Sequence, residues 1–253
     1  MCLILFSYRK HPRYRLILAA NRDEFYDRPT ESAGFWEEDG NILAGKDLKL
    51  GGTWLGITRN GRFAAITNYR EPGSFKPDAP SRGKLVSGFL EGTAAPCDYL
   101  RAVAVSAGKY NGFNILVGDT DRLCYFSNRN GGVKELAPGL YGLSNHLLDT
   151  PWPKVKLGKR LLGAALDGDF RPDELFRILR NSIRPDDSQL PDTGIGLDWE
   201  RVLSTVFIKS PVYGTRSSTL VTVDYGGSVE FTERVFNSHP GPEQVNHFSF
   251  KIE

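Results

Sequence analysis

Consecutive apolar positions near the start of the chain predict two adjacent strands. Residues 3–8 and 15–20 are rich in strand-forming side chains, and the polar residues 9–13 between them, broken by Pro12, indicate a hairpin connection. Apolar residues that follow one another along a strand imply that both faces of the sheet are covered. The polar residues 21–24 that follow are expected to form a turn.

A second hairpin is predicted over residues 53–67. The strand-forming residues 53–58 and 63–67 flank Asn60-Gly61, a pair that readily takes the positive φ angles of a tight turn. Further strands are predicted at residues 112–117, 123–127, 141–143, 205–208, 218–223 and 229–234, with a turn at Gly226-Gly227 between the last two. The sheets are therefore expected to be mostly antiparallel.

Four segments show the spacing of apolar residues that is typical of helices. The first pair covers residues 85–90 and 100–104, and the second pair covers residues 157–166 and 175–183. Pro172-Asp173-Glu174 supplies the proline and negative charge that suit a first helical turn.

The order of strand pairs and helix pairs predicts an α+β protein. The arrangement that covers both faces of each sheet is a four-layer αββα sandwich of two mostly antiparallel sheets. The sequence contains no internal repeat or long linker, and the polar stretches 72–80 and 184–198 are typical of surface loops. One domain spanning residues 1–253 is therefore expected.

Composition narrows the class of protein. Apolar residues make up 40% of the chain, and no apolar run reaches the about 18 residues that a membrane helix needs. The formal charge of +2 is near balance, so a nucleic-acid partner is not expected. The first eight residues lack the basic leader of a signal peptide, which favours a cytoplasmic location. No motif indicates a cofactor or a metal site.

The cysteines are few and must be judged singly. Cys2, Cys97 and Cys124 form no Cys-x-x-Cys pair, so neither a disulfide framework nor a zinc site is indicated. Packing explains Cys97, near a predicted helix start, and Cys124, within an apolar strand.

Cys2 has a second interpretation besides that of a small buried apolar residue. Removal of Met1, which a small second residue permits, would leave a thiol and a free α-amine on one residue. The α-amine has a pKa of about 8 and the thiol of about 8.5, so the amine can accept the thiol proton near neutral pH. Attack on an acyl carbon then becomes feasible.

Seven spaced motifs together resemble the NRDE family. They are AANRDEF at residues 19–25, GGTWLG at 51–56, TNY at 67–69, YNGFN at 110–114, YGLSN at 141–145, TPW at 150–152 and YGTR at 213–216. The resemblance extends from Cys2 to about Arg234, effectively the whole chain.

The signature Asn-Arg-Asp-Glu and the leading cysteine in turn resemble N-terminal-nucleophile hydrolases of the bile-salt hydrolase and penicillin V acylase type, which have the αββα fold. The resemblance implies that Cys2 is the nucleophile and that Asp23 orients its α-amine. It also implies that Asn68 and Asn145 donate amide hydrogens to a developing oxyanion, and that Arg216 stabilises charge beside the nucleophile.

Each of these residues also has a plain structural interpretation. Asp23, Asn68 and Asn145 are residue types that commonly form turns, and Arg216 fits an ion pair at a strand end. The same resemblance leads us to expect substrate contacts from four further residues: Asn21, Arg22, Trp54 and Tyr69.

One position departs from the hydrolase pattern. Those amidases carry a further arginine three residues before the aspartate, where this chain has Ala20. Arg22 adjoins Asp23 instead, and strand alternation is expected to point its side chain elsewhere. The resemblance therefore supports the fold and the nucleophile more strongly than the amidase reaction.

Three functions compete. The first is a Cys2-dependent amidohydrolase that acts on a carbon-nitrogen bond of a small acylated substrate through a thioester. The second is a non-catalytic carrier of a hydrophobic anion, because the resemblance also implies roles in lipid or acyl-coenzyme A metabolism and haem trafficking. Haem finds no specific ligand in the sequence. A trafficking adaptor ranks last, since the sequence offers no coiled coil or exposed amphipathic helix.

Overall fold

Two antiparallel sheets, each with its own helices, organise the chain. The structure is a computed structural model and describes residues 2–236 and 243–253. One compact unit comprises Met1–Asp27 and Pro138–Ser249, and the other comprises Arg28–Ala137 and Phe250–Glu253. The predicted α+β class with mostly antiparallel sheets is confirmed. That the whole chain is one domain stays a prediction.

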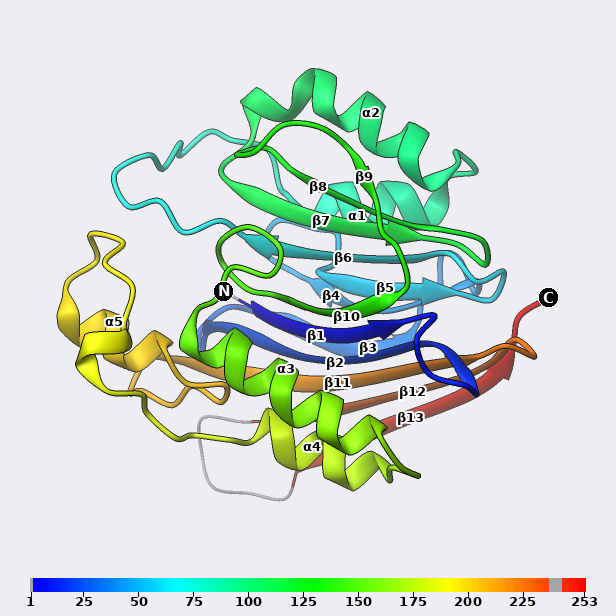
Figure 1. The fold of residues 1–253 in the computed structure, drawn as a ribbon. Coiled ribbons are helices and arrows are strands. Elements are labelled where there is room, and N and C mark those ends of the chain that lie inside the picture. The colour runs from blue at the N-terminus through cyan, green and yellow to red at the C-terminus, as the bar shows by residue number, and fades with distance from the viewer. Residues whose placement is uncertain (1, 237–242) are drawn as a thin grey trace. The chain divides into compact units, whose positions relative to one another are not determined.

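The first unit holds a six-stranded sheet (Figure 1). Its order is β10 (Gly139–Leu143), β1 (Cys2–Tyr8), β2 (Tyr14–Phe25), β11 (Tyr213–Asp224), β12 (Ser228–Val235) and β13 (Gln244–Lys251). Its helices are α3 (Pro153–Leu166), α4 (Pro172–Leu179) and α5 (Leu197–Leu203), with a short 3-10 turn at Asp187–Gln189.

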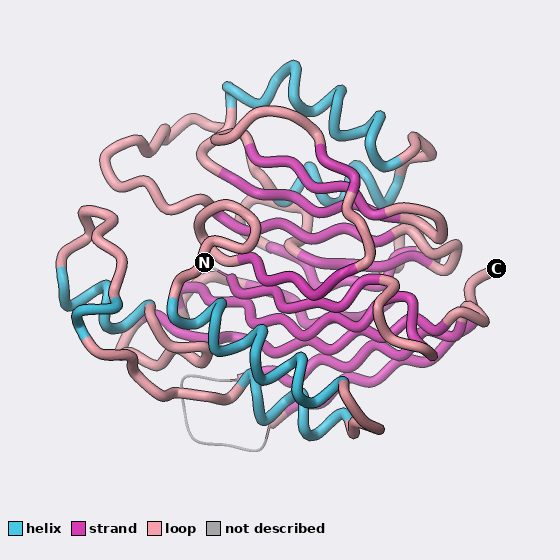
Figure 2. Tube along the Cα trace, viewed as in Figure 1, coloured by secondary structure: helices cyan, strands magenta, loops and turns pink. Residues whose placement is uncertain are grey.

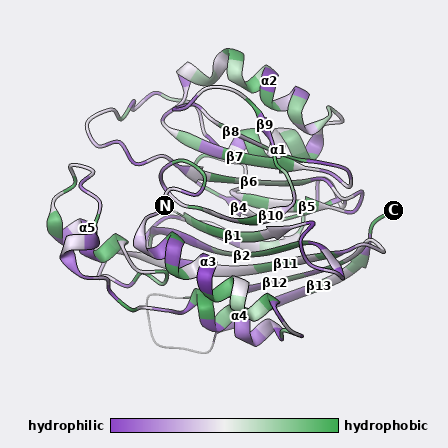
Figure 3. Cartoon of the chain, in the orientation of Figure 1, coloured by the Kyte–Doolittle hydropathy of each residue, from purple (hydrophilic) through white to green (hydrophobic). Residues whose placement is uncertain are grey.

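Helices α3 and α4 cover one face of this sheet. Leu5 and Ile17 from the strands share a buried apolar cluster with Leu162 and Phe176 from the helices. Figure 3 shows most of β1 coloured as hydrophobic, and all of its residues are buried. Gly158 lies where α3 meets β1, and a Cβ atom there would come within 2.6 Å of Leu5 Cδ1.

The second unit holds a seven-stranded sheet whose strands follow sequence order. They are β3 (Thr30–Phe35), β4 (Ile42–Asp47), β5 (Leu55–Thr58), β6 (Phe63–Asn68), β7 (Phe113–Gly118), β8 (Leu123–Ser127) and β9 (Lys134–Glu135). Helices α1 (Gly83–Glu91) and α2 (Pro96–Ser106), followed by a 3-10 turn at Ala107–Lys109, pack on it through a buried cluster that includes Phe89, Leu100 and Phe113. Figure 2 separates the strands and helices of both units by colour.

Most predicted elements are confirmed, but the expected turn at residues 21–24 is wrong. β2 continues through these residues because β11 pairs with all of them, and β1 also pairs with Asn21 and Arg22. Asn21 lies opposite Leu3 of β1 and Ser218 of β11, and Asp23 lies opposite Thr215 of β11. A polar sequence therefore occupies the middle of a sheet rather than a surface turn.

The strand expected at residues 205–208 is also absent. This stretch follows α5 and runs as irregular backbone, although Val206 is fully buried in the cluster under α3 and α4. Strands β3, β4, β9 and β13 and helix α5 were not predicted. Among the described residues, no helix is both long and apolar enough to cross a membrane.

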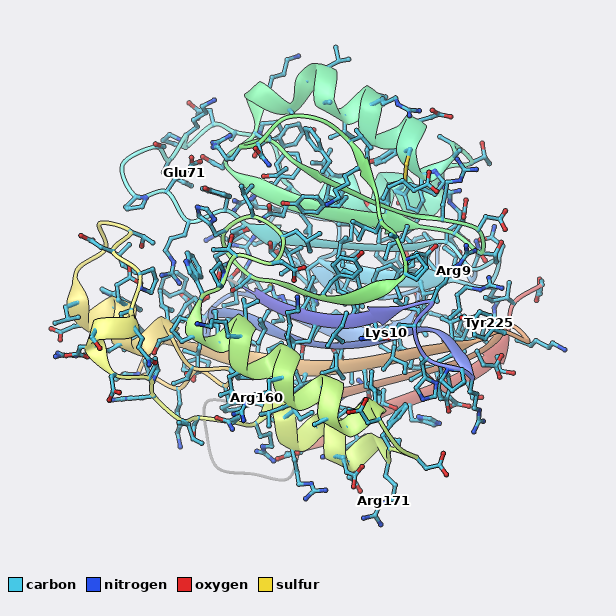
Figure 4. All side chains as sticks on the ribbon, in the orientation of Figure 1. Arg9, Lys10, Glu71, Arg160, Arg171 and Tyr225 are labelled. Atoms are coloured by element: carbon cyan, nitrogen blue, oxygen red, sulfur yellow. A yellow bond between two sulfur atoms is a disulfide. The ribbon has the colours of Figure 1, made fainter. Side chains whose placement is uncertain are left out.

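The prediction that Cys97 and Cys124 are merely packed apolar residues is wrong. Their sulfur atoms form a disulfide that joins α2 to β8 across 27 residues of sequence, drawn in yellow in Figure 4. Sequence spacing alone cannot reveal such a bond, because the pairing depends on how α2 packs on the sheet. Disulfides are unusual in reducing compartments. Whether Cys97 and Cys124 are oxidised in the purified protein therefore bears on the predicted cytoplasmic location.

The Gly51-Gly52 pair has a structural role. Both residues have positive φ, and a Cβ atom at Gly52 would lie 2.4 Å from the carbonyl carbon of Gly83, the first residue of α1. The Thr53 amide donates to the Gly83 carbonyl at 3.3 Å, and the Ser81 hydroxyl donates to the Gly51 carbonyl at 3.2 Å. The backbone at the start of α1 therefore packs directly against Gly52, where a side chain would not fit.

Gly52→Ala is expected to destabilise the protein by about 3 kcal/mol or more, because backbone must shift as well as adopt a strained φ. Gly73→Ala is the matched control, since Gly73 also has positive φ but no atom lies within 4 Å of its Cβ position. That control should cost only about 1–2 kcal/mol. Urea unfolding measures both, and equal losses would contradict the close-approach argument.

Reduction of the Cys97–Cys124 disulfide is expected to lower the free energy of unfolding by about 3 kcal/mol, since the bond closes a loop of 27 residues in the unfolded chain. Urea unfolding with and without dithiothreitol measures the loss. The double variant Cys97→Ala, Cys124→Ala should be insensitive to the reductant. Equal stability of oxidised and reduced wild-type protein would contradict this expectation.

Candidate active site

Cys2 opens β1 with its side chain buried. Only 7% of the residue is exposed, and its thiol is free. In β2 the residue directly opposite Cys2 is Arg22, and the backbone N–H of Asp23 hydrogen-bonds the Cys2 thiol. The nucleophile expected from sequence therefore lies at the end of an inner strand, in contact with the Asn-Arg-Asp-Glu segment.

Asn145 reaches the same end of the sheet from β10. Leu143, the last residue of β10, pairs with Ile4, so Asn145 follows the strand toward Cys2. The Ser144 hydroxyl donates to the Cys2 carbonyl at 3.2 Å and to Asn145 Oδ1 at 3.1 Å. Asn145 is completely buried. Its fixed position beside Cys2 is compatible with the amide-donor role expected from sequence.

Asp23 lies on the opposite face of β2 from Arg22. Its Oδ1 accepts a hydrogen bond from the Thr215 hydroxyl at 2.7 Å, and its backbone carbonyl accepts one from Tyr213 at 2.9 Å. Burial raises the pKa of the Asp23 carboxyl, while the charge of the buried Lys154 and the Thr215 hydrogen bond act in the opposite direction. The carboxyl is therefore held rigidly by β11 and influenced by a cation on α3.

The expectation that strand alternation would point Arg22 away from the site is wrong. Arg22 is two residues beyond Ala20, so both side chains lie on the same face of β2, and Arg22 is in register with Cys2. Only 7% of Arg22 is exposed, and its Nη1 has no hydrogen-bond partner among the described residues. A buried, incompletely paired guanidinium thus lies beside Cys2.

Arg216 is placed by a bulge in β11. Thr215 pairs with Asp23 and Ser217 pairs with Arg22, so Arg216 is the extra residue between them. Such bulges redirect a side chain and occur often beside active sites. Arg216 Nη1 donates to the Phe25 carbonyl at 2.8 Å. Burial lowers the pKa of Arg216, and the like charge of Arg22 lowers it further.

The electrostatics around Cys2 favour the protonated form of its thiol. Burial raises the pKa of the thiol, and the negative charge of Asp23 acts in the same direction. The charge of Arg22 and the hydrogen bond from the Asp23 backbone act in the opposite direction. Met1, whose removal would expose the α-amine of Cys2, lies outside the described residues.

Asn21 has a framework role in this geometry. It is fully buried, and its amide nitrogen donates to the carbonyls of Leu179 and Val206 at 2.9 and 2.8 Å. Its Oδ1 accepts from the Ser218 hydroxyl at 2.6 Å. These bonds tie β2 to the end of α4 and to the irregular segment after α5, so the predicted contact with substrate has no support in the geometry.

Three predicted site residues belong to the second unit. Asn68 ends β6 opposite Phe113, and the backbone N–H of Tyr69 donates to the Gly112 carbonyl at 2.9 Å. Trp54 is half-buried against the apolar cluster of that unit. Burial raises the pKa of the Tyr69 hydroxyl. The oxyanion role of Asn68 and the substrate contacts of Trp54 and Tyr69 stay predictions.

Sequence reasoning missed the residues that support the site. Ser144 and Thr215 lie inside two of the recognised motifs, and their hydroxyls hold Asn145 and Asp23. Motif position could have indicated both. Lys154 could not be found in this way, because a lysine in the first turn of a helix is usually solvent-exposed, whereas this one is 2% exposed.

The described residues offer one grouping of potential metal ligands, formed by Cys97, Cys124 and Glu135. Because the two sulfur atoms are bonded to each other, neither is a thiolate that could bind a metal ion. The grouping lies in the second unit and includes none of the predicted site residues.

Solved structures identify the fold class. The conjugated bile acid hydrolase from Clostridium perfringens is similar over 98% of this chain and 92% of that chain, with a TM-score of 0.55 and 9% identity. An N-acylethanolamine-hydrolyzing acid amidase ortholog from Caenorhabditis elegans is similar over 87% and 92%, with a TM-score of 0.50 and 12% identity. The chain therefore has the fold of N-terminal-nucleophile hydrolases.

Sequence comparison identifies the family. The family model described as Transport and Golgi organisation 2 matches residues 1–238. The Transport and Golgi organization protein 2 homolog of Bos taurus is 41% identical, with 100% of both chains covered. The homolog of Homo sapiens is 42% identical over 92% of each chain, and the Drosophila melanogaster protein is 31% identical over 92% and 91%. The chain belongs to this family, and this match confirms the resemblance to the NRDE family that the seven motifs indicated.

Asn21→Ala is expected to destabilise the first unit by about 2–4 kcal/mol, since it leaves the buried Leu179 and Val206 carbonyls without their donors. Ser218→Ala, which removes one hydrogen bond to Asn21 Oδ1, should cost about 1 kcal/mol. Urea unfolding distinguishes the two. A loss for Asn21→Ala no larger than that for Ser218→Ala would contradict the framework role.

Proposed function

We propose that the protein is a Cys2-dependent amidohydrolase that cleaves a carbon-nitrogen bond of a small acylated substrate. The observation that carries the proposal is the cross-strand pair of Cys2 and Arg22 at the end of an inner strand, with Asn145 fixed nearby. Both similar solved proteins are named as hydrolases, one of conjugated bile acid and one of N-acylethanolamine. Those names support the reaction class and leave the substrate open.

The reaction would begin once Met1 has been removed. The α-amine of Cys2 takes the thiol proton, and the thiolate attacks the carbonyl carbon of the amide. The C–N bond breaks as the amine leaves with that proton, and a thioester remains on Cys2. Water then attacks the thioester, which releases the acid and returns the thiol.

Each neighbouring residue has a defined part in this scheme. Asp23 stabilises the α-amine in its protonated form, because Thr215 holds the carboxyl in place on the adjacent strand. Asn145 supplies an amide hydrogen to the oxyanion that forms during attack. Arg22 supplies positive charge on the face where Ala20 replaces the arginine of the hydrolase pattern. An anionic substrate group or the oxyanion would accept a hydrogen bond from Arg22 Nη1, which has no acceptor among the described residues.

Intact-mass spectrometry with p-nitrophenyl acyl esters tests the proposal. The purified wild-type protein is expected to lack Met1 and to gain one acyl group on Cys2. Cys2→Ala should gain none, whereas Asn145→Ala should acylate about 100-fold more slowly through loss of an oxyanion donor. Cys2→Ser is the control for processing, since serine also permits removal of Met1.

Two outcomes would contradict the proposal that the protein is a Cys2-dependent amidohydrolase. Wild-type protein that retains Met1 has no α-amine on Cys2 to act as base. If the Cys2→Ala variant is acylated as readily as the processed wild-type protein, the acylated residue is a nucleophile other than Cys2. In either case the remaining hypothesis is that the protein carries a hydrophobic anion. Haem and acyl-coenzyme A are then the ligands to test by equilibrium binding.

A further inference from the structure

A cavity of about 640 Å³ lies in the first unit, and Cys2 is not among its lining residues. One wall is the first two turns of α3, and the other walls come from the segment after α4 and the segment after α5. Its lining residues are Pro151, Pro153, Lys154, Lys156, Leu157, Arg160, Ile183, Pro185, Gln189, Ser204 and Val206. The volume is within the usual range for sites that hold small organic molecules.

The charge of this cavity has one sign. Lys154, Lys156 and Arg160 line it, and no aspartate or glutamate does. Arg160 is labelled on α3 in Figure 4. Neither Lys156 nor Arg160 forms an ion pair with any residue in the described part of the chain. Both are exposed, so their charges are available to a bound anion.

Two carboxylates near the cavity are engaged with cations outside its lining. Lys159, on the same helix but outside the lining, pairs with Asp149 at 2.6 Å. Asp187, which lies between the lining residues Pro185 and Gln189, pairs with Arg201 at 2.5 Å. Asp186 lies between the same two lining residues and is exposed, but three cations line the cavity, so an excess of positive charge remains.

The same cavity offers apolar surface beside its cations. Leu157 and Val206 form part of its lining, and Ile183 also lines it although 67% of that residue is exposed. A large apolar side chain left exposed at the mouth of a cavity is a feature of sites that bind partly apolar ligands. Gln189 and Ser204 add polar groups to the lining.

We infer that this cavity binds a small organic anion whose carboxylate or phosphate head group pairs with Lys156 and Arg160 and whose short apolar part lies against Leu157 and Ile183. Guanidinium and ammonium groups both form strong hydrogen bonds to such head groups. The first turn of α3 adds the favourable field of a helix N-terminus. This site lies outside the proposed Cys2 chemistry and does not depend on it.

Lys154 connects the site to Asp23. It lines the cavity and is buried, and its positive charge opposes the rise that burial causes in the pKa of the Asp23 carboxyl. A bound anion and the Asp23 carboxylate therefore compete for the same positive charge. By reciprocity, removal of the Asp23 charge should strengthen binding of the anion as much as the bound anion disfavours ionisation of Asp23.

Titrations of the full-length chain with hexanoate and with hexyl phosphate test the site, using amide chemical shifts in nuclear magnetic resonance spectra as the readout. Cys2→Ala is titrated in parallel, so that loss of the nucleophile cannot mimic loss of this site. Both proteins are expected to bind at least one of the two probes, with shifts concentrated at residues 154–160 and 183–206. Tighter binding of hexanoate would indicate a carboxylate as the natural head group, and tighter binding of hexyl phosphate would indicate a phosphate.

The double variant Lys156→Gln, Arg160→Gln should weaken binding by at least about 10-fold, the effect of losing about 1.4 kcal/mol of charge pairing. Both residues are exposed, so the variant should fold. Arg177→Gln, which removes an exposed charge of α4 outside the lining, should bind as wild type does. Hexanol and inorganic phosphate, which each lack one part of the probe, should bind more weakly.

Several results would overturn the inference. They are failure of both probes to bind at millimolar concentration, unchanged affinity in the double variant, and shifts confined to the surroundings of Cys2. Asp23→Asn tests the link through Lys154 and should bind the probe more tightly than wild type. Unchanged affinity in Asp23→Asn would show that the cavity and the Asp23 carboxyl are independent.

Discussion

The pairing of β2 on both of its long sides is the constraint on which the site depends. Because β1 and β11 hold every residue of the Asn-Arg-Asp-Glu segment in register, neighbouring side chains must point to opposite faces. Arg22 consequently shares a face with Cys2, while Asn21 and Asp23 face the side of α3 and α4. A turn at these positions, which the polar sequence favours, would fix none of these relations.

Burial of this segment is costly unless its polar groups have partners. Asn21 satisfies its amide within the framework, and the Asp23 carboxyl receives the Thr215 hydroxyl and the field of Lys154. Arg22 is less completely satisfied, since one of its nitrogens is buried without a hydrogen bond among the described residues. Unsatisfied buried groups are rare in folded proteins and concentrate where a ligand or reaction uses them.

Local patterns predicted the elements better than the contacts between them. The β5–β6 hairpin followed from Asn60-Gly61, and the start of α4 followed from Pro172 and its acidic neighbours. The extension of β2 depends on pairing with a strand about 190 residues away in sequence, as the register of Thr215 with Asp23 shows. The disulfide and the burial of Lys154 likewise arise from tertiary packing. Motif resemblance supplied Cys2, Asp23 and Asn145, but it could not assign Arg22 to a face.

Asp23 is the one residue of the segment that acts on both faces of β2. Its backbone N–H hydrogen-bonds the Cys2 thiol, while its carboxyl lies within the field of Lys154, which lines the cavity of the first unit. A change of charge in that cavity can therefore reach the thiol through electrostatics alone, without movement of the sheet. Because Asp23 and Lys154 are both buried, solvent screens the interaction between their charges far less than it screens surface charges. The register that fixes Cys2 beside the Asn-Arg-Asp-Glu segment also fixes Asp23 in its sheet, within the field of the Lys154 charge.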